Sequence, residues 1–228
     1  MREYTEEEKI RLLEAQSLME QGHLEEAESC YEEAIELYNE AMAVFEELQY
    51  PKGKIEVLDG LANVLRNKGE YKQSLEHLEK ALEIAEKIGL YLTKAMTYSG
   101  MGLVYLNLGE YERSLDFHRK ALTINKEFGN KMGEGRSLGN IGLVYQNQGQ
   151  YEEAIKHYKQ AIIIVREIGN KRFYGINLGN IGIVYDKLGR YDEAIEAYQK
   201  AIKIAKEIGH KRSEGRNLGN IGIVYQNM

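Results

Sequence analysis

The sequence predicts an all-α protein of the α-solenoid class, in which antiparallel helical hairpins stack side by side. Three observations predict this class: a forty-residue repeat, apolar residues at helical spacing within each repeat, and glycines where each repeat would turn. A helix with an apolar stripe on one side cannot bury that stripe alone, whereas a row of neighbouring hairpins can. The chain, with 228 residues, is long enough for such an array.

The repeat is most visible in the octapeptide LGNIGLVY at residues 138–145, which returns as LGNIGIVY at 178–185 and at 218–225. A comparison of residues 169–185 with 209–225 finds 13 of 17 positions identical. Five series of residues recur at intervals of forty. They are Gly102, Gly142, Gly182 and Gly222; Tyr105, Tyr145, Tyr185 and Tyr225; Gly69, Gly109, Gly149 and Gly189; Tyr71, Tyr111, Tyr151 and Tyr191; and Ala81, Ala121, Ala161 and Ala201. This regularity indicates one structural unit per forty residues.

Each unit has the pattern of two amphipathic helices, which we name helix A and helix B. In the fourth unit the apolar residues of helix A step by three, three and one, and those of helix B by one, three, three, one and three. They are Leu138, Ile141, Val144 and Tyr145, followed by Ala154, Ile155, Tyr158, Ala161, Ile162 and Val165. Gly149 stands where helix A would end, and the GNK sequence at 169–171 marks the next break.

We expect a single array over residues 1–228. Its units are predicted at residues 5–48, 53–88, 91–128, 131–168 and 171–208, with helix A of a sixth unit at 211–227. In the first unit, with helices at 5–21 and 24–48, Ala15 and Ala62 are 47 residues apart, and the Tyr-x-x-Ala pattern occurs twice, at Tyr31 and Tyr38. The seven extra residues are close to two helical turns, so we predict an extended helix B in this unit.

Composition and charge argue against several classes of protein. The apolar runs reach only about five residues, as at 161–165, far short of the roughly 20 that span a bilayer. The start, MREYTEEEKI, lacks the apolar stretch of a secretory signal. A single cysteine, Cys30, excludes an internal disulfide, and we expect a cytoplasmic protein. The net charge of −6, divided as −12 over residues 1–50 and +6 over the remainder, argues against a general nucleic-acid binder.

The recurring glycine, tyrosine and alanine residues resemble the tetratricopeptide repeat (TPR). In the fourth unit the residues that carry the resemblance are Gly142, Tyr145, Ala154, Tyr158 and Ala161. The resemblance covers the whole chain, although its period of forty exceeds the family's usual length of about 34 and the family's proline near the end of helix B is missing. The resemblance implies a right-handed superhelix of stacked antiparallel hairpins.

The LGN copies and the forty-residue period look like one branch of this family, the Pins/LGN-type polarity adaptors. Kinesin light chains and bacterial peptide-sensing regulators look like more distant relatives. This resemblance implies a concave groove, lined by the A helices, that binds a peptide or a segment of a partner protein.

The glycines inside helix A need a structural reason, because each costs about 0.5–1 kcal/mol relative to alanine. In the TPR pattern Gly142 faces Ala154, and two small residues let helices A and B approach closely. Gly139 is expected on the groove side, where it would leave room for the backbone of a ligand.

The candidate binding residues lie on the groove side of helix A. A helix turns by about 100° per residue, so the apolar residues define its buried side and leave polar residues toward the groove. An asparagine amide both donates and accepts, which suits pairing with a peptide group. The resemblance to Pins-like adaptors implies contacts of the arginines and of the other asparagines with acidic partner segments. Asn147 is a candidate only because it falls on or near the groove side of helix A. The candidate partner-binding residues are Arg136, Asn140, Asn147, Asn180, Arg216 and Asn220.

Alternatives remain open for these positions. The asparagines either contact a ligand or bond a neighbouring helix and hold the stack, and an amide has enough bonding sites for both. A basic strip at the start of helix A is either a surface suited to carboxylates or an ordinary solvated edge. Its members are Lys131, Lys171, Arg172, Lys211 and Arg212. Glycine stands at the asparagine position at Gly60 and Gly100, so any such site is biased to the carboxyl-terminal half.

The sequence carries no recognisable catalytic, cofactor or metal motif. It has no P-loop, no HExxH and no Cys-x-x-Cys, and its five histidines are scattered. His118 replaces the tyrosine of the repeat and is expected to be packed and hydrogen-bonded. Tyr105, Tyr145 and Tyr185 are expected in the core. We therefore predict neither an enzyme nor a bound cofactor or metal.

The leading hypothesis is a non-enzymatic interaction module or scaffold that binds a peptide or partner segment, with an acidic, extended one favoured by the basic strip. An alternative is a scaffold that stacks end to end, because helix 211–227 leaves Leu218, Ile221, Val224 and Tyr225 without a covering helix B. A third is RNA binding by helical repeats, against which the negative charge and the repeat type argue. We therefore predict protein or peptide partners, with neither nucleic acid nor membrane among them.

Overall fold

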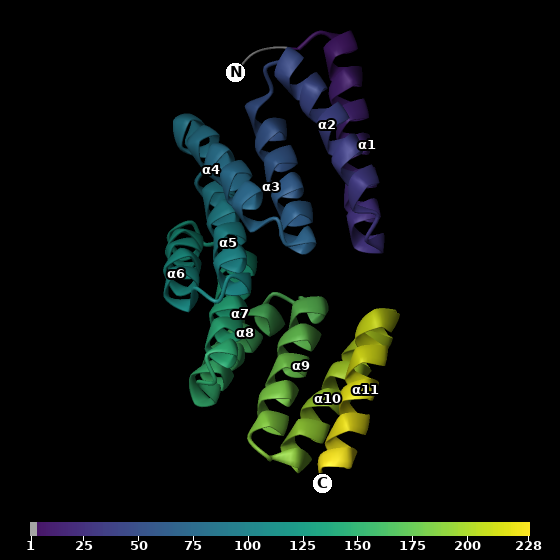
Figure 1. Ribbon diagram of the computed structural model, residues 1–228, viewed down its shortest axis with the longest axis vertical. Coiled ribbons are helices and arrows are strands. Elements are labelled where there is room, and N and C mark those ends of the chain that lie inside the picture. Colours follow the sequence, from purple (N-terminus) through teal and green to yellow (C-terminus); the bar gives the residue numbers. More distant parts are fainter. Residues whose placement is uncertain (1–3) are drawn as a thin grey trace. The chain divides into compact units, whose positions relative to one another are not determined.

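The computed structural model describes residues 4–228, and all regular secondary structure in that range is α-helical (Figure 1). The eleven helices of the described range are α1 (Glu6–Glu28), α2 (Tyr31–Glu47), α3 (Pro51–Lys68), α4 (Tyr71–Ile88), α5 (Tyr91–Asn107), α6 (Tyr111–Glu127), α7 (Lys131–Asn147), α8 (Tyr151–Glu167), α9 (Lys171–Lys187), α10 (Tyr191–Glu207) and α11 (Lys211–Asn227). Odd-numbered helices are A helices and even-numbered helices are B helices. The predicted all-α class is confirmed. Over the described residues, no helix has the length and apolar character needed to span a membrane.

The chain, which was expected to be one array, divides into two compact units, Met1–Gly109 and Glu110–Met228. Helices α1 to α5 of the first unit pack in chain order, each against the next, and α6 to α11 of the second unit do the same. Figure 1 shows α1, α2 and α3 side by side, and likewise α9, α10 and α11. The predicted stacking of helical hairpins is therefore confirmed within each unit.

The turns lie where the glycines predict them. Gly149 follows α7 with φ of +74°, in the left-handed region that favours glycine. The next N–H, that of Gln150, donates to the Tyr145 carbonyl at 2.9 Å and so satisfies an acceptor at the helix end. After the following turn, the Asn170 side chain caps α9 by accepting from the Phe173 N–H at 2.9 Å.

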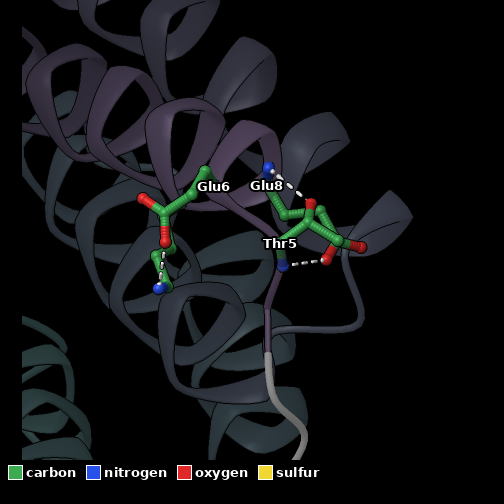
Figure 2. A network of polar contacts seen from close by, with 4 residues as sticks. Thr5, Glu6 and Glu8 are labelled. Atoms are coloured by element: carbon green, nitrogen blue, oxygen red, sulfur yellow. Dashed lines mark hydrogen bonds and ion pairs between the residues drawn. The ribbon is translucent and has the colours of Figure 1, made fainter.

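Helix α1 begins with a capping box (Figure 2). The Thr5 hydroxyl accepts from the Glu8 N–H at 3.2 Å, and the Glu8 carboxylate accepts from the Thr5 N–H at 2.8 Å. These contacts satisfy two donors that have no partner within the helix. Beside them, Glu6 pairs with Lys9 at 2.6 Å on the solvent side. The local sequence therefore determines where α1 starts.

The prediction of an extended helix B in the first unit is wrong. The longer helix is the A helix α1, with 23 residues, whereas α2 has 17. Gly22, predicted between the two helices, lies inside α1, where a Cβ would be 2.8 Å from the Tyr38 ring. The helix ends instead before Ser29, which has φ of 68°. Gly22 therefore precedes Ala62 by forty residues, and the regular period includes the first unit.

The mid-helix glycines pack against buried tyrosine rings. A Cβ on Gly142 would lie 2.8 Å from the Tyr158 ring, and a Cβ on Gly182 would lie 2.6 Å from the Tyr198 ring. Both tyrosines are fully buried. The prediction that glycine lets helices A and B approach closely is confirmed, but the group that fills the space is the ring rather than Ala154.

Helix α11 is covered on one side only. Val224 is fully buried and packs against Tyr198 of α10, whereas Leu218 and Tyr225 are 51% and 62% exposed. A Cβ on Gly222 would meet no atom within 4 Å. The predicted uncovered face is therefore present at Leu218 and Tyr225 and absent at Val224.

Candidate functional site

Neighbouring A helices of the second unit touch through a glycine and an asparagine. A Cβ on Gly139 of α7 would lie 2.9 Å from Oδ1 of Asn177 on α9. The same contact recurs one repeat later, where a Cβ on Gly179 would lie 2.8 Å from Oδ1 of Asn217 on α11. Each of these buried asparagines donates to a carbonyl one turn earlier in its own helix, at 2.8 Å. Gly139 therefore makes room for a side chain of the next repeat, and the expectation that it leaves room for a ligand is wrong.

In the first unit the equivalent contact between A helices is polar on both sides. The Thr97 hydroxyl of α5 donates to the Asp59 carboxylate of α3 at 3.3 Å. Burial, opposed by this hydrogen bond, raises the pKa of Asp59 to about 7. The first unit therefore holds its A helices together by a different chemistry from the second.

The asparagines of the LGN motif lie next to the tyrosines of the preceding B helix. Asn180 of α9 lies near the Tyr158 hydroxyl, and Asn220 of α11 lies near that of Tyr198. The Tyr158 hydroxyl donates to Oε1 of Gln146 at 2.9 Å. Burial raises the pKa of both tyrosines, that of Tyr198 to about 12, so both remain neutral donors at pH 7. Asn180 and Asn220 are half-buried, so a part of each side chain is open to solvent.

His118 occupies the tyrosine position on α6, one repeat before Tyr158. It is fully buried, and neither ring nitrogen has a hydrogen-bond partner among the described residues. Burial lowers its pKa to about 4, so the ring is neutral at pH 7. The expectation that His118 is packed is confirmed, and the expectation that it is hydrogen-bonded is wrong. Asn140 on α7, half-buried like Asn180, holds the equivalent position in the following A helix.

Arg136 and Arg172 carry positive charge on the surface of the A helices. The guanidinium carbon of Arg136 lies 5.2 Å from the centre of the Phe173 ring, a cation–π geometry. Arg136 is exposed to solvent, and desolvation by its neighbours and, to a smaller degree, the charge of Arg172 lower its pKa. The ion pairs found among residues 4–228 include neither arginine.

The lysines of the basic strip already have carboxylate partners. The pairs are Lys131 with Glu134 at 2.9 Å, Lys171 with Glu207 at 3.1 Å and Lys211 with Glu214 at 3.3 Å. Exposed ion pairs of this kind contribute little to stability. The arginines of the strip, Arg172 and Arg212, are absent from the ion pairs found in the described residues.

All six candidate residues belong to A helices of the second unit, on α7, α9 and α11. Arg216 is exposed on α11 at the position of Arg136 on α7. Asn147 is exposed at the end of α7, where its amide donates to the Leu143 carbonyl at 2.8 Å. We name the surface that carries Arg136, Asn140, Arg172, Asn180, Arg216 and Asn220 the A-helix face.

The tyrosines predicted in the core, Tyr105, Tyr145 and Tyr185, are half-buried, and the last two pack against a buried apolar cluster. Both rings have polar neighbours: His157 stacks on Tyr145, and the Arg190 guanidinium lies 4.5 Å from the centre of the Tyr185 ring. Within the described part of the chain, no group of three or more His, Cys, Asp or Glu side chains could hold a metal ion.

Three residues that make contacts between neighbouring A helices were missed in the sequence: Asn177, Asn217 and Phe173. A signal was present for the asparagines, because each follows the first glycine of an LGN copy by 38 residues, at Gly139 and Gly179. The repeat alone does not reveal that these two positions meet, since they lie on different helices. For Phe173 the sequence offers no such signal.

The family model of the tetratricopeptide repeat matches residues 13–87, 53–127 and 133–207. These segments span five of the predicted units. The chain belongs to the tetratricopeptide repeat family. The resemblance seen in the glycine, tyrosine and alanine series is thereby confirmed, and the Pins/LGN branch stays a prediction.

Solved structures share this TPR fold at low sequence identity. A Rap protein complexed with Competence and Sporulation Factor matches with a TM-score of 0.82 and 22% identity, over 94% of this chain and 63% of that one. Aspartyl phosphate phosphatase F from Bacillus subtilis matches with a TM-score of 0.77 and 21% identity, over 97% and 61%. The Rap conjugation gene regulator of the plasmid pLS20, in complex with the Phr* peptide, matches with a TM-score of 0.77 and 18% identity, over 88% and 55%.

This TPR chain spans only part of those relatives, 61% of the phosphatase and 63% of the Rap protein. Among curated proteins, none matches its sequence. The solved structures therefore support the fold, and any activity of the whole relatives lies outside what the likeness shows.

Proposed function

We propose that this chain is a non-enzymatic interaction module that binds a carboxylate-bearing peptide or partner segment on its A-helix face. The observation that carries the proposal is a pair of arginines without a carboxylate partner, in which Arg136 stacks on Phe173, the residue next to Arg172. Two nearby cations repel each other, so a carboxylate placed between them gains attraction and charge-assisted hydrogen bonds from both. The Phe173 ring holds the guanidinium of Arg136 in position for such a contact.

The asparagines suit the backbone of the same ligand. Asn140, Asn180 and Asn220 present one half-buried amide on each A helix of the face. Neighbouring helices lie roughly 8–10 Å apart, and an extended chain advances about 3.3 Å per residue, so one amide meets about every third peptide residue. In this proposal Arg216 extends the cationic surface onto α11, and Asn147 contacts the ligand at the far end of α7.

The relatives support a peptide as the class of ligand. Two of the similar structures are complexes, one with Competence and Sporulation Factor and the other with the Phr* peptide. TPR arrays stack their repeats into extended binding surfaces, which is the use proposed for this chain. The phosphatase activity in the name of one relative belongs to that relative, and we propose no catalytic site for this chain. The cytoplasmic location of this chain stays a prediction.

Removal of both arginines tests the proposal. For a fluorescein-labelled extended peptide with Glu at every third position, Arg136→Ala with Arg172→Ala is expected to weaken binding by about 3- to 30-fold, since each exposed charge-assisted contact contributes up to about 1 kcal/mol. Fluorescence anisotropy at 150 mM salt measures the dissociation constants of the wild type and the variant.

The matched control removes two exposed lysines from B helices of the same unit, Lys126→Ala with Lys203→Ala. It changes the net charge equally and is expected to alter binding by less than about threefold, because screened surface charges contribute little. An equal loss in both double variants would reduce the interaction to general charge attraction, and absence of peptide binding to the wild type would refute the proposal.

A second candidate function is end-to-end self-assembly through α11. The exposed Leu218 and Tyr225 favour it, and so does the contrast between the acidic residues 1–50, with a balance of −12, and the remainder at +6. Opposite charges at the two ends would guide a head-to-tail contact. Light scattering over a hundredfold range of concentration decides, because a mass that stays at one chain throughout excludes this function.

A further inference from the structure

A hollow of about 230 Å³ lies between two B helices of the second unit, and its lining includes none of the arginines of the A-helix face. Helix α9 supplies its floor with Leu178, Ile181 and Tyr185, and the flanking B helices supply Ile162 from α8 and Ala197 from α10. The walls are thus aliphatic, and one aromatic ring stands at the end of the floor.

The hollow exists because the two sides of the stack are packed differently. On the A side, Asn177 reaches the space above Gly139, so α7 and α9 touch directly. On the B side, α8 and α10 each pack against α9, and over the described residues no Cα atom of α8 lies within 8 Å of one of α10. Large side chains are therefore required to fill the space between successive B helices.

In the preceding repeat the equivalent space is filled. The imidazole of His157 stacks on the Tyr145 ring, with ring centres 5.3 Å apart and an angle of 16° between the planes. Arg119 of the B helix before it donates to the Tyr145 hydroxyl at 3.2 Å. One ring and one guanidinium thus close the gap between α6 and α8 over α7.

The fifth repeat lacks both of these groups. Ala197 stands forty residues after His157, and Lys159 stands forty residues after Arg119. The same position holds a large side chain in every earlier repeat: Leu37, His77, Phe117 and His157. Arg190 does approach the Tyr185 ring, but Arg190 is outside the lining of the hollow and binds Glu193. The substitution of alanine for a ring is what leaves the hollow open.

We propose that this hollow binds one aromatic side chain from a partner protein, stacked on Tyr185 in the place that His157 occupies on Tyr145. A cavity of about 150 Å³ lined by aliphatic and aromatic side chains is enough for benzene, so this hollow has room for a phenol or an indole. Offset or parallel ring contacts contribute about 0.5–1.5 kcal/mol beyond the burial of area.

The rim of the hollow suits the same ligand. Lys159 and Lys200 stand on opposite sides of it, on α8 and α10, where an ammonium can approach the face of a bound ring. Glu193 and Glu196 complete the rim, so its charge is balanced and does not select an acidic partner. The hollow therefore recognises its ligand by the aromatic ring and not by charge. It is a different surface from the proposed carboxylate site.

Small-molecule probes test the proposal on the full chain. Titration of p-cresol, followed by the methyl NMR signals of Ile162, Leu178, Ile181 and Ala197, is expected to give saturable shifts. Cyclohexanol, which has a similar size and no ring electrons, is expected to bind about 3- to 10-fold more weakly, as the loss of stacking implies. No saturable shift with p-cresol, or equal affinity for cyclohexanol, would overturn the proposal.

Two exchanges between the repeats complete the test. Ala197→His should fill the hollow as His157 fills its equivalent, and weaken p-cresol binding by at least about tenfold. His157→Ala should open a second hollow over Tyr145 and add new saturable shifts at the methyl groups of Ile141. Ala43→His, at an exposed site on α2, is the control and should leave binding unchanged. Unaltered binding by Ala197→His in a folded chain would contradict the proposal, as would the absence of new shifts in His157→Ala.

Discussion

Gly182→Ala is expected to lower the free energy of unfolding of the second unit by about 1–3 kcal/mol, although alanine is the better helix former. The added Cβ would lie 2.6 Å from the ring of Tyr198, which is buried and cannot move aside without shifting α10. Urea unfolding followed by circular dichroism measures the change.

Gly222→Ala provides the opposite result from the same substitution at the equivalent position. No atom lies within 4 Å of its would-be Cβ, so only the helix preference remains. We expect a gain of about 0.5–1 kcal/mol, read in the same unfolding experiment. If both variants gained stability, the close approach of Gly182 and Tyr198 would not be a packing constraint.

A third variant separates the clash from other effects. In the second repeat the glycine position is Ala62 and the tyrosine position is Leu78, and both are buried. Gly182→Ala combined with Tyr198→Leu copies that pair into the fifth repeat. The double variant should cost less than the sum of its single changes, because the smaller side chain leaves room for the added methyl group. Strict additivity would count against the steric explanation.

Lowering the pH from about 7 to 4 is expected to remove roughly 3 kcal/mol of stability through His118 alone. Its pKa is about 4 in the folded chain and 6.5 in the reference state, so the unfolded chain takes up a proton first. The contribution is fully present above pH 6.5. It is lost at about 1.4 kcal/mol per pH unit as the pH falls from 6.5 toward 4, and it changes no further below that value.

His118→Tyr is the variant that isolates this effect. Tyrosine is the residue of the repeat at Tyr38, Tyr158 and Tyr198, and it does not titrate in this range. Urea unfolding at a series of pH values should give a wild-type curve steeper than that of the variant between pH 6.5 and 4. Parallel curves would show that His118 does not carry the pH dependence.

The comparison between variants is needed because Asp59 acts in the opposite direction. Its pKa rises from 3.8 to about 7 on folding, so it contributes stability below pH 3.8 that is lost as the pH rises toward 7. Asp59 lies in the first unit and is unchanged in His118→Tyr, so its contribution cancels in the difference between the two curves.

Local signals in the sequence predicted the turns well and the first repeat poorly. Gly149 was assigned correctly because a glycine after an apolar stripe ends a helix through its own backbone preference. Gly22 was misread as a turn because glycine also occurs where a neighbouring ring needs space. Only the contact with Tyr38 distinguishes the two uses.

In the candidate site, too, some features follow from local sequence and others only from contacts between helices. The positions of Arg136 and Asn180 on the A helices followed from helical periodicity and from the family resemblance. The proximity of Asn180 to Tyr158 did not, because that tyrosine comes from the preceding B helix. The sequence shows that Ala197 lacks the ring found at His157, but it does not show that the space of that ring stays open.

By itself, the sequence determined the class of fold, the forty-residue period and most helix boundaries, because these depend on the spacing of residues along one helix and on backbone preferences at its ends. The tertiary structure alone decided which side chain fills each glycine space, that Arg136 stacks on Phe173 beside Arg172, and that α8 and α10 leave a hollow over Tyr185. These features depend on distances between helices that neighbouring repeats set jointly, and no single helix contains that information.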